Sequence, residues 1–215
     1  RVVVKVNGVP YKSKRELFGR VRTVIFTPDD LQIVKGGPEK RREFLDLYLA
    51  QAYPGYREVY LLFYRALYQR NALLKRFKEG ARDLNQLEVW TDRLVETGSR
   101  VILYRRQALA EISQWLNHYH QVMSNEQETL RCLYKGNDDP AAELDLEAIK
   151  AGFGRALRQK NGVELRYGYT LVGPHRDDLQ ILLNDRWELR VYGSQGQQRT
   201  AALALKLAMV DLIAK

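Results

Sequence analysis

A short polar turn near the C-terminus holds the residues best suited to chemistry. Ser194, Gln195, Gly196 and Gln197 lie directly before an alanine- and leucine-rich run that reaches Lys215. The S-x-x-Q spacing is typical of a capping box, in which the two side chains satisfy free backbone N–H groups at a helix start. A helix N-terminus also carries positive partial charge, and a glycine there lets a ligand approach the backbone. The turn therefore predicts either a site for a terminal phosphate or simply a well-capped buried helix.

Two further groups of polar residues are candidates for binding. The turn at 173–178 contains His175, Arg176 and two aspartates, and residues 1–22 carry seven basic side chains against a lone Glu16. Cations in such numbers suit phosphate contacts, whereas a salt-bridged loop or a solvated helix face is the structural alternative. The candidate DNA or interface contacts are Lys12, Lys14, Arg15, Arg41, Arg42, His175 and Arg176.

Metal binding and serine hydrolysis are not predicted. His118 and His120 lie two positions apart on an expected helix, so they point to different faces and are expected to be ordinary surface histidines. Ser194 and His175, with either Asp177 or Asp178, are the residue types of a hydrolytic triad, but no G-x-S-x-G elbow accompanies them. We therefore expect no catalytic residue and no metal ligand in this chain.

Composition and charge favour a globular, nucleic-acid-binding protein. The 215 residues are 45% hydrophobic and 28% charged, with a formal net charge of +9. This excess favours a polyanionic partner, nucleic acid before an acidic membrane. Cys132 is the only cysteine, which excludes a disulfide framework and predicts a cytoplasmic location, and no apolar run is long enough for a membrane span. The chain lacks an initiator Met and stops within a helical pattern, so we expect a piece of a longer protein.

Local patterns in the first half predict a hairpin followed by long helices. Asn7-Gly8 is typical of a hairpin, 24–26 reads as a strand, and 27–30 suits a turn or a first helical turn. Apolar positions at helical spacing then predict helices over 39–52, over 56–77, and from Leu84 to Met123 with an interruption at 97–99. These helices are expected to form a small antiparallel bundle or arm.

The second half is expected to combine helices with another hairpin. The polar run at 135–140 is the best linker candidate, and 144–159 reads as a helix. Asn184-Asp185 divides the alternating run of 179–191 into a second hairpin. The last helix, over 195–215, is apolar almost all round and is expected to be buried.

Three segments resemble motifs of one family. Residues 26–46 resemble the F-x-P-x-D-L-x-L-V-K-G-x-P-x-x-R-R-x-F-L-D block of the bacterial recombination protein RecF, and 170–178 resembles the second block of that family. Residues 194–199 are similar to its version of the ABC-type signature. The resemblance implies an α/β (mixed α+β) fold, namely an ABC/SMC-like ATPase head fragment that is mostly the helical second lobe, with two β-hairpins. It assigns 1–27 to strands of lobe I and 28–215 to lobe II, with a helical arm about 38–160, a hairpin about 165–192 and a signature helix at 195–215.

The resemblance also implies a function. The family's parent protein is a weak ATPase that dimerises on ATP and Mg, binds double-stranded and gapped DNA, and helps RecR and RecO load RecA. Its signature turn, here Ser194, Gln195, Gly196 and Gln197, would sense the γ-phosphate of ATP in the other subunit. No G-x-x-x-x-G-K-[ST] phosphate loop and no strand ending in paired acidic residues occur in this sequence, so this chain alone is expected to be inactive. A non-catalytic partner-binding module and a head fragment of another SMC-like ATPase are the alternatives.

Overall fold

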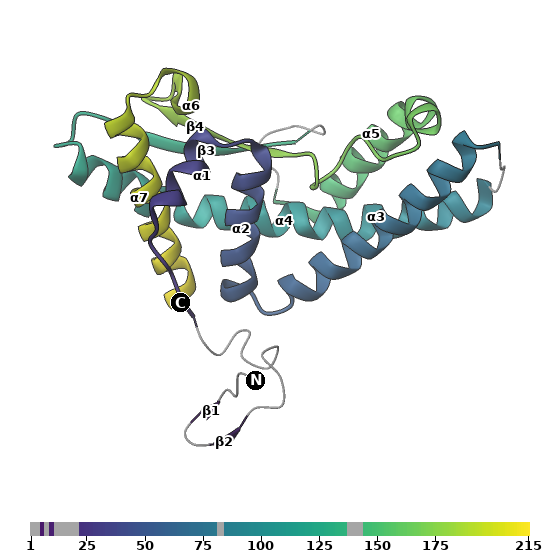
Figure 1. The fold of residues 1–215 in the computed structure, drawn as a ribbon, viewed down its shortest axis with the longest axis horizontal. Coiled ribbons are helices and arrows are strands. Elements are labelled where there is room, and N and C mark those ends of the chain that lie inside the picture. Colours follow the sequence, from purple (N-terminus) through teal and green to yellow (C-terminus); the bar gives the residue numbers. More distant parts are fainter. Residues whose placement is uncertain (1–4, 7–8, 11–21, 81–83, 137–143) are drawn as a thin grey trace.

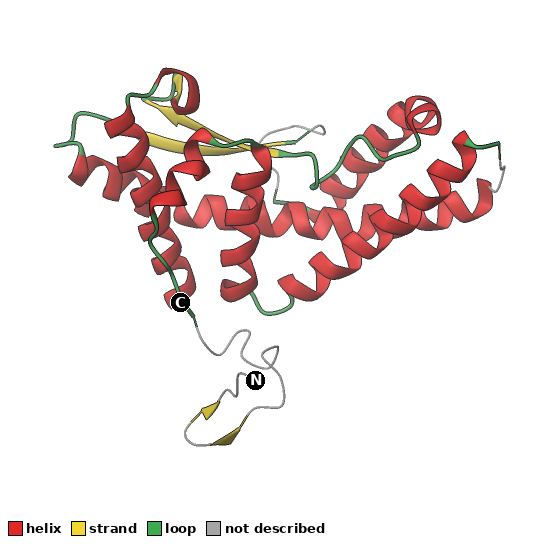
Figure 2. Ribbon diagram, viewed as in Figure 1, coloured by secondary structure: helices red, strands yellow, loops and turns green. Residues whose placement is uncertain are grey.

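The computed structural model describes residues 5–6, 9–10, 22–80, 84–136 and 144–215. Their helices are α1 (Gln32–Lys35), α2 (Pro38–Ala52), α3 (Tyr56–Lys78), α4 (Leu84–Met123), α5 (Leu146–Tyr167), α6 (Leu189–Tyr192) and α7 (Gln195–Ala214), preceded by a 3₁₀ turn at Pro28–Leu31. The strands are β1 (Lys5–Val6), β2 (Val9–Pro10), β3 (Leu130–Lys135), β4 (Asp178–Leu183) and β5 (Trp187–Glu188). Helices predominate, as the periodicity predicts (Figure 2).

The long helix α4 is the axis around which the other elements are arranged. Its N-terminal half packs along α3 and below α5, and together these helices form an elongated arm (Figure 1). Its C-terminal half crosses α7 and carries β3 on one side. The main hydrophobic core follows this axis, and its fully buried members include Leu45, Ile112 and Phe153. One helix thus connects the arm to the helix that follows the polar turn.

A three-stranded antiparallel sheet, in the order β3-β4-β5, lies beside α4. The hairpin predicted at Asn184-Asp185 is confirmed, because both residues have positive φ, 52° and 53°, and join β4 to β5. The connection contains three residues, 184–186, and the first two have the left-handed geometry that Asn and Asp adopt readily in turns. The hairpin predicted at Asn7-Gly8 is also confirmed by the antiparallel pairing of β1 with β2. The sequence patterns missed β3, and they placed a strand where the structure has the helical turn α6.

The strand predicted at 24–26 is wrong. This segment has no regular secondary structure, and Ile25 and Phe26 are 67% and 50% exposed. It lies against α7, where Lys206 donates a 2.6 Å hydrogen bond to the Ile25 carbonyl oxygen. A strand requires a ladder partner, and here one carbonyl is satisfied by a side chain instead. The turn predicted at 27–30 is confirmed, because Thr27 and Asp30 form a capping box at the 3₁₀ turn.

The interruption predicted at 97–99 is also wrong, because α4 runs unbroken through Gly98. A Cβ at Gly98 would lie 2.7 Å from Phe153 Cε1 and 3.2 Å from Phe63 Cδ2. The glycine therefore permits three helices to approach closely and does not end one. In the same region α5 extends to Tyr167, eight residues past the predicted end and into the predicted hairpin. The linker predicted at 135–140 falls largely outside the described residues, since 137–143 are not described.

Candidate functional site

The polar turn before α7 forms the predicted capping box. The Ser194 backbone N–H donates to Gln197 Oε1 over 2.7 Å, and Gln197 N–H donates to Ser194 Oγ over 3.2 Å. Ser194 has extended backbone geometry, with φ −61° and ψ 163°, as an N-cap residue does. The helix behind the turn is anchored by core residues such as Leu205 and Met209, both at most 1% exposed. The turn is therefore a fixed feature of the surface.

A carboxylate from a distant segment also fixes the turn. Gln197 Nε2 donates to Glu128 Oε1 over 2.6 Å, and Glu128 Oε2 lies 3.3 Å from Nε2 of His120. His120 is fully buried at the end of α4, so its expected position on the surface is wrong. Burial lowers the pKa of His120, and the Glu128 carboxylate partly offsets this effect. Glu128 thus joins the last turn of α4 to the first turn of α7.

The outer side of the turn is exposed to solvent. Ser194, Gln195 and Gly196 are exposed, and a Cβ at Gly196 would meet no atom closer than Ser194 Oγ at 3.9 Å. No described residue accepts a hydrogen bond from the backbone N–H of Gln195 or Gly196. These donors and the positive end of the helix dipole fit a single phosphate group. The residues 22–80, 84–136 and 144–215 contain no cluster of three metal-ligating side chains.

The two predicted contacts on α2 are partly used inside the molecule. Arg41 is 3% exposed and binds both oxygens of Asp178, over 2.7 and 2.8 Å, as well as the Gly36 carbonyl oxygen. This geometry ties α2 to the start of β4 and leaves little of Arg41 exposed for the predicted DNA or interface contact. Arg42 donates to the Asp177 carbonyl oxygen over 2.7 Å. Lys12, Lys14 and Arg15 lie outside the described residues.

The two predicted contact residues in the turn at 173–178 differ in exposure. His175 is largely enclosed, with its ring centroid 5.9 Å from that of Phe63 and Nε2 3.3 Å from the Thr170 carbonyl oxygen. Burial, together with the positive charges of Arg176, Arg42 and Arg105, lowers the pKa of His175 to about 4. His175 is therefore neutral at pH 7. Arg176, in contrast, is exposed and lies over the ring of Tyr169 at 5.5 Å.

Two buried arginines that hold these segments in place carry no sequence signal. Arg105, on α4, binds both carboxylate oxygens of Asp46 over 2.9 Å and the Pro174 carbonyl oxygen over 2.6 Å. Arg70, on α3, binds Glu164 and Thr170, each over 2.7 Å. Their partners are 59 to 100 residues away along the chain, so no local spacing could have revealed them. Glu128 was missed for the same reason, because it lies 69 residues from Gln197.

No family model matches the chain, whereas individual proteins match it closely. It is 40% identical over 210 residues to the "DNA replication and repair protein RecF" of Halalkalibacterium halodurans. The aligned region covers 98% of this chain and 56% of that protein. The protein of the same name from Bacillus subtilis is 39% identical over 210 residues and is again covered to 56%. The chain thus spans little more than half the length of these relatives.

Solved structures agree with the sequence relatives. A structure described as the recombination mediator protein RecF with ATP, in the RecFOR pathway, is 36% identical and superposes with a TM-score of 0.90. The match covers 99% of this chain and 56% of the solved chain. It confirms the predicted fold class, a mixed, mainly helical fragment of a RecF-like ATPase head. Within the described ranges, no helix has the length and apolarity that a membrane crossing needs. The resemblance carried by the three motifs is therefore confirmed, because over nearly its whole length this chain is similar to RecF in both sequence and fold.

Proposed function

We propose that this chain is the second lobe of a RecF-type ATPase subunit, in which the turn at 194–197 senses the γ-phosphate of ATP bound by a partner subunit. The observation that carries the proposal is the free, exposed N-terminus of α7. Its backbone donors at Gln195 and Gly196 have no described acceptor, while the capping box and Glu128 hold the turn in one geometry. ADP lacks the γ-phosphate, so only ATP gives these donors something to bind across the subunit interface.

The wider role follows from the relatives. We propose that the parent protein dimerises on ATP and Mg in the cytoplasm, binds gapped and double-stranded DNA, and acts with RecR and RecO to load RecA. The phosphate loop and the acidic magnesium-binding strand would be supplied by residues beyond this sequence, since neither motif occurs in it. The lobe boundaries predicted from the family resemblance, with 1–27 in lobe I and 28–215 in lobe II, are part of this proposal.

The two alternatives have less support. A head fragment of another SMC-like ATPase would carry long coiled coils, whereas the arm of this chain turns back after α3, a helix of 23 residues. A module that only binds partners has no need of free backbone donors at a rigid helix N-terminus. The similarity to RecF proteins, at about 40% identity, also favours a RecF-type ATPase subunit over both alternatives.

The experiment is to replace Ser194 with aspartate in the full-length protein and to measure ATP-dependent dimerisation by light scattering. Aspartate caps a helix as well as serine does, so α7 should remain as stable as in the parent protein. Its negative charge would repel the γ-phosphate at the same position. We expect ATP-driven dimerisation and hydrolysis to be lost while ATP binding to the monomer persists. Ser194→Arg, which blocks the site with a bulky cation, should have the same effect.

The control is Ser194→Thr, which keeps both the cap and the hydroxyl group. It should dimerise with ATP like the parent protein. If Ser194→Asp also dimerises normally, then Ser194 only caps a buried helix and the proposed role in ATP sensing is wrong.

A further inference from the structure

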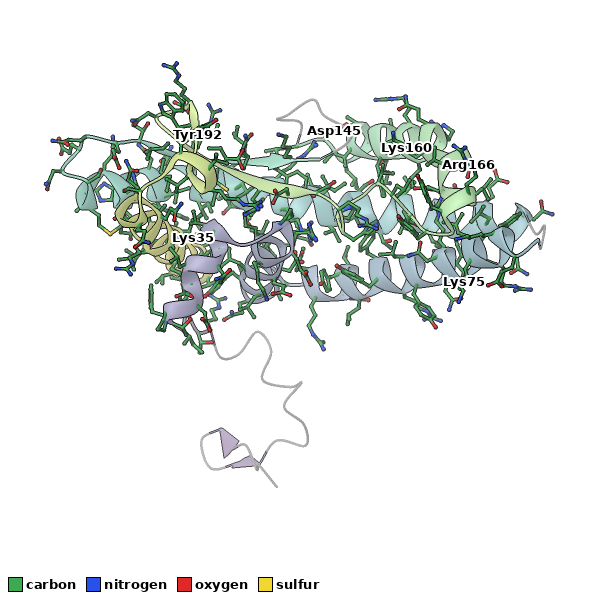
Figure 3. All side chains as sticks on the ribbon, turned by 45° about the horizontal axis from the view of Figure 1, so that its top comes forward. Lys35, Lys75, Asp145, Lys160, Arg166 and Tyr192 are labelled. Carbon is green, nitrogen blue, oxygen red and sulfur yellow. The ribbon has the colours of Figure 1, made fainter. Side chains whose placement is uncertain are left out.

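The segment that connects α5 to β4 crosses the surface of the arm and lies directly on α3. Gly168 ends α5 in left-handed geometry, with φ +84°. A Cβ there would lie 3.4 Å from Lys78 Cδ and 3.5 Å from Lys75 Cα. The residues on either side of Gly168 are therefore placed beside the basic last turn of α3. Figure 3 shows Lys75 and Arg166 on the two neighbouring helices of the arm.

This crossing is held rigidly from below. Asn71 Oδ1 accepts hydrogen bonds from the backbone N–H of Thr170 over 2.8 Å and from its hydroxyl over 2.7 Å. Arg70 donates to the same hydroxyl, and Glu164 accepts from the backbone N–H of Leu171 over 2.7 Å. Because these contacts are made by buried or partly buried groups, the side chains on the outer side are presented by a fixed backbone.

Two tyrosines on this crossing face solvent. Tyr167 and Tyr169 are 57% and 41% exposed, and their ring centroids lie 6.0 Å apart with a 30° angle between the ring planes. The guanidinium of Arg176 lies 5.5 Å from the Tyr169 centroid. Exposed aromatic rings next to an arginine are the arrangement on which unpaired nucleobases stack.

The cations around the tyrosines are not neutralised locally. The arm patch, as we name it, consists of Lys75, Lys78, Arg166, Tyr167, Tyr169 and Arg176. Its four cations are exposed, and none forms an ion pair with a carboxylate in the part of the chain that the structure describes. Glu164, which is close in sequence, is buried and bound to Arg70. The patch therefore presents positive charge together with aromatic surface.

We propose that the arm patch binds single-stranded nucleic acid, with the tyrosines stacking on unpaired bases and the four cations contacting phosphates. A duplex keeps its bases inside the helix, so the exposed rings could add little to its binding. An acidic protein partner would use the cations but not the ring faces. The inference rests on the proposed function for its biological setting, but the binding itself requires neither ATP nor dimerisation.

The test is fluorescence anisotropy on the 215-residue chain, without nucleotide, using a labelled oligo(dT) of about 20 nucleotides and a duplex of the same length. Tyr169→Leu should weaken oligo(dT) binding by about 5- to 150-fold and leave duplex binding nearly unchanged. Tyr169→Phe keeps the ring and should restore binding. Replacing Lys75 and Arg166 with alanine should reduce the slope of log affinity against log salt by about 1.4, or about 0.7 per lost contact.

The matched controls are Lys35→Ala and Tyr192→Leu, which alter exposed side chains on α1 and α6, away from the arm (Figure 3). Both should bind oligo(dT) like the parent chain. Equal loss in these controls, an unchanged affinity of Tyr169→Leu, or equal competition by polyglutamate would overturn the proposal. In the full-length protein, Tyr169→Leu should still dimerise with ATP. Failure of the Ser194 test would therefore leave this inference standing, and failure here would leave ATP sensing standing.

Discussion

At the scale of single residues, the surroundings of the turn at 173–178 determine which buried groups are charged. Arg105 is fully enclosed and stays charged because the Asp46 carboxylate and the Pro174 carbonyl oxygen surround it. Removing one member of such a buried pair typically costs about 3–5 kcal/mol, because the other is left uncompensated. His175, one residue from Pro174, has the opposite surroundings, since it is enclosed beside cations and has no carboxylate partner in the described chain.

His175 should make the fold sensitive to mild acid. Its pKa is about 4 in the folded state and about 6.5 in an unfolded chain, so the unfolded state takes up the proton first as the pH falls. The stability present above pH 6.5 is therefore lost between pH 6.5 and pH 4. We expect about 1–2 kcal/mol to be lost by pH 5, measured by urea denaturation.

His175→Asn removes the titrating group, so its stability should fall less than that of the parent chain between pH 7.5 and pH 5. The same replacement at exposed His118 controls for the loss of a histidine. If the parent chain and His175→Asn lose equal stability over this range, His175 is not the group responsible.

At the scale of elements, packing explains which sequence patterns could be interpreted and which could not. The capping box at Ser194 and the turn at Asn184-Asp185 are local signals, because their hydrogen bonds and dihedral angles depend on adjacent residues. The prediction of a helix break at Gly98 is wrong because the glycine is required by its close contacts with Phe63 and Phe153, which lie on two other helices. The strand β3 was missed because its pairing with β4 joins segments about fifty residues apart. Element type was thus predictable where the cause was local.

Gly98→Ala should destabilise the protein although alanine favours helix. The helical preference would add about 1 kcal/mol, whereas forcing a methyl group 2.7 Å from Phe153 Cε1 costs typically about 1–3 kcal/mol and occasionally more. We expect a net loss of free energy of unfolding in urea denaturation.

The matched control is Gly162→Ala, inside α5, where a Cβ would meet no atom within 4 Å. This change should stabilise the protein by up to about 1 kcal/mol. A stabilising Gly98→Ala would show that Phe63 and Phe153 can move aside at little cost, and the close approach would then not be the reason for the glycine.

At the scale of the whole molecule, ATP hydrolysis depends on motifs that this sequence does not contain. The sequence contains no G-x-x-x-x-G-K-[ST] phosphate loop, so we expect the 215-residue chain alone to release no phosphate from ATP. The measurement is a phosphate-release assay on protein freed of contaminating ATPases. Turnover above a buffer blank that disappears in Ser194→Asp would contradict this expectation.

The family motifs predicted more of the candidate site than the charge pattern did. The block at 194–199 pointed to the turn, whose geometry depends on its own residues. Net charge, by contrast, could not distinguish Arg41, which forms a buried ion pair with Asp178, from Arg176, which is exposed. Counting cations cannot separate these roles, because the acceptor lies 137 residues away. The arm patch carries no local sequence signal, because it forms where the end of α5 meets the last turn of α3.

The unbroken length of α4 has a mechanical consequence. Forty residues make a rod of about 60 Å, which begins at the free end of the arm and ends where His120 meets Glu128. The Tyr119 hydroxyl binds Asp211 on α7 over 2.7 Å, so the rod is pinned near one end. By simple lever geometry, a tilt of about 5° at that pivot sweeps the other end through about 5 Å. A rocking of α7 that was transmitted through this contact would move the tip of the arm by about the length of one helical turn.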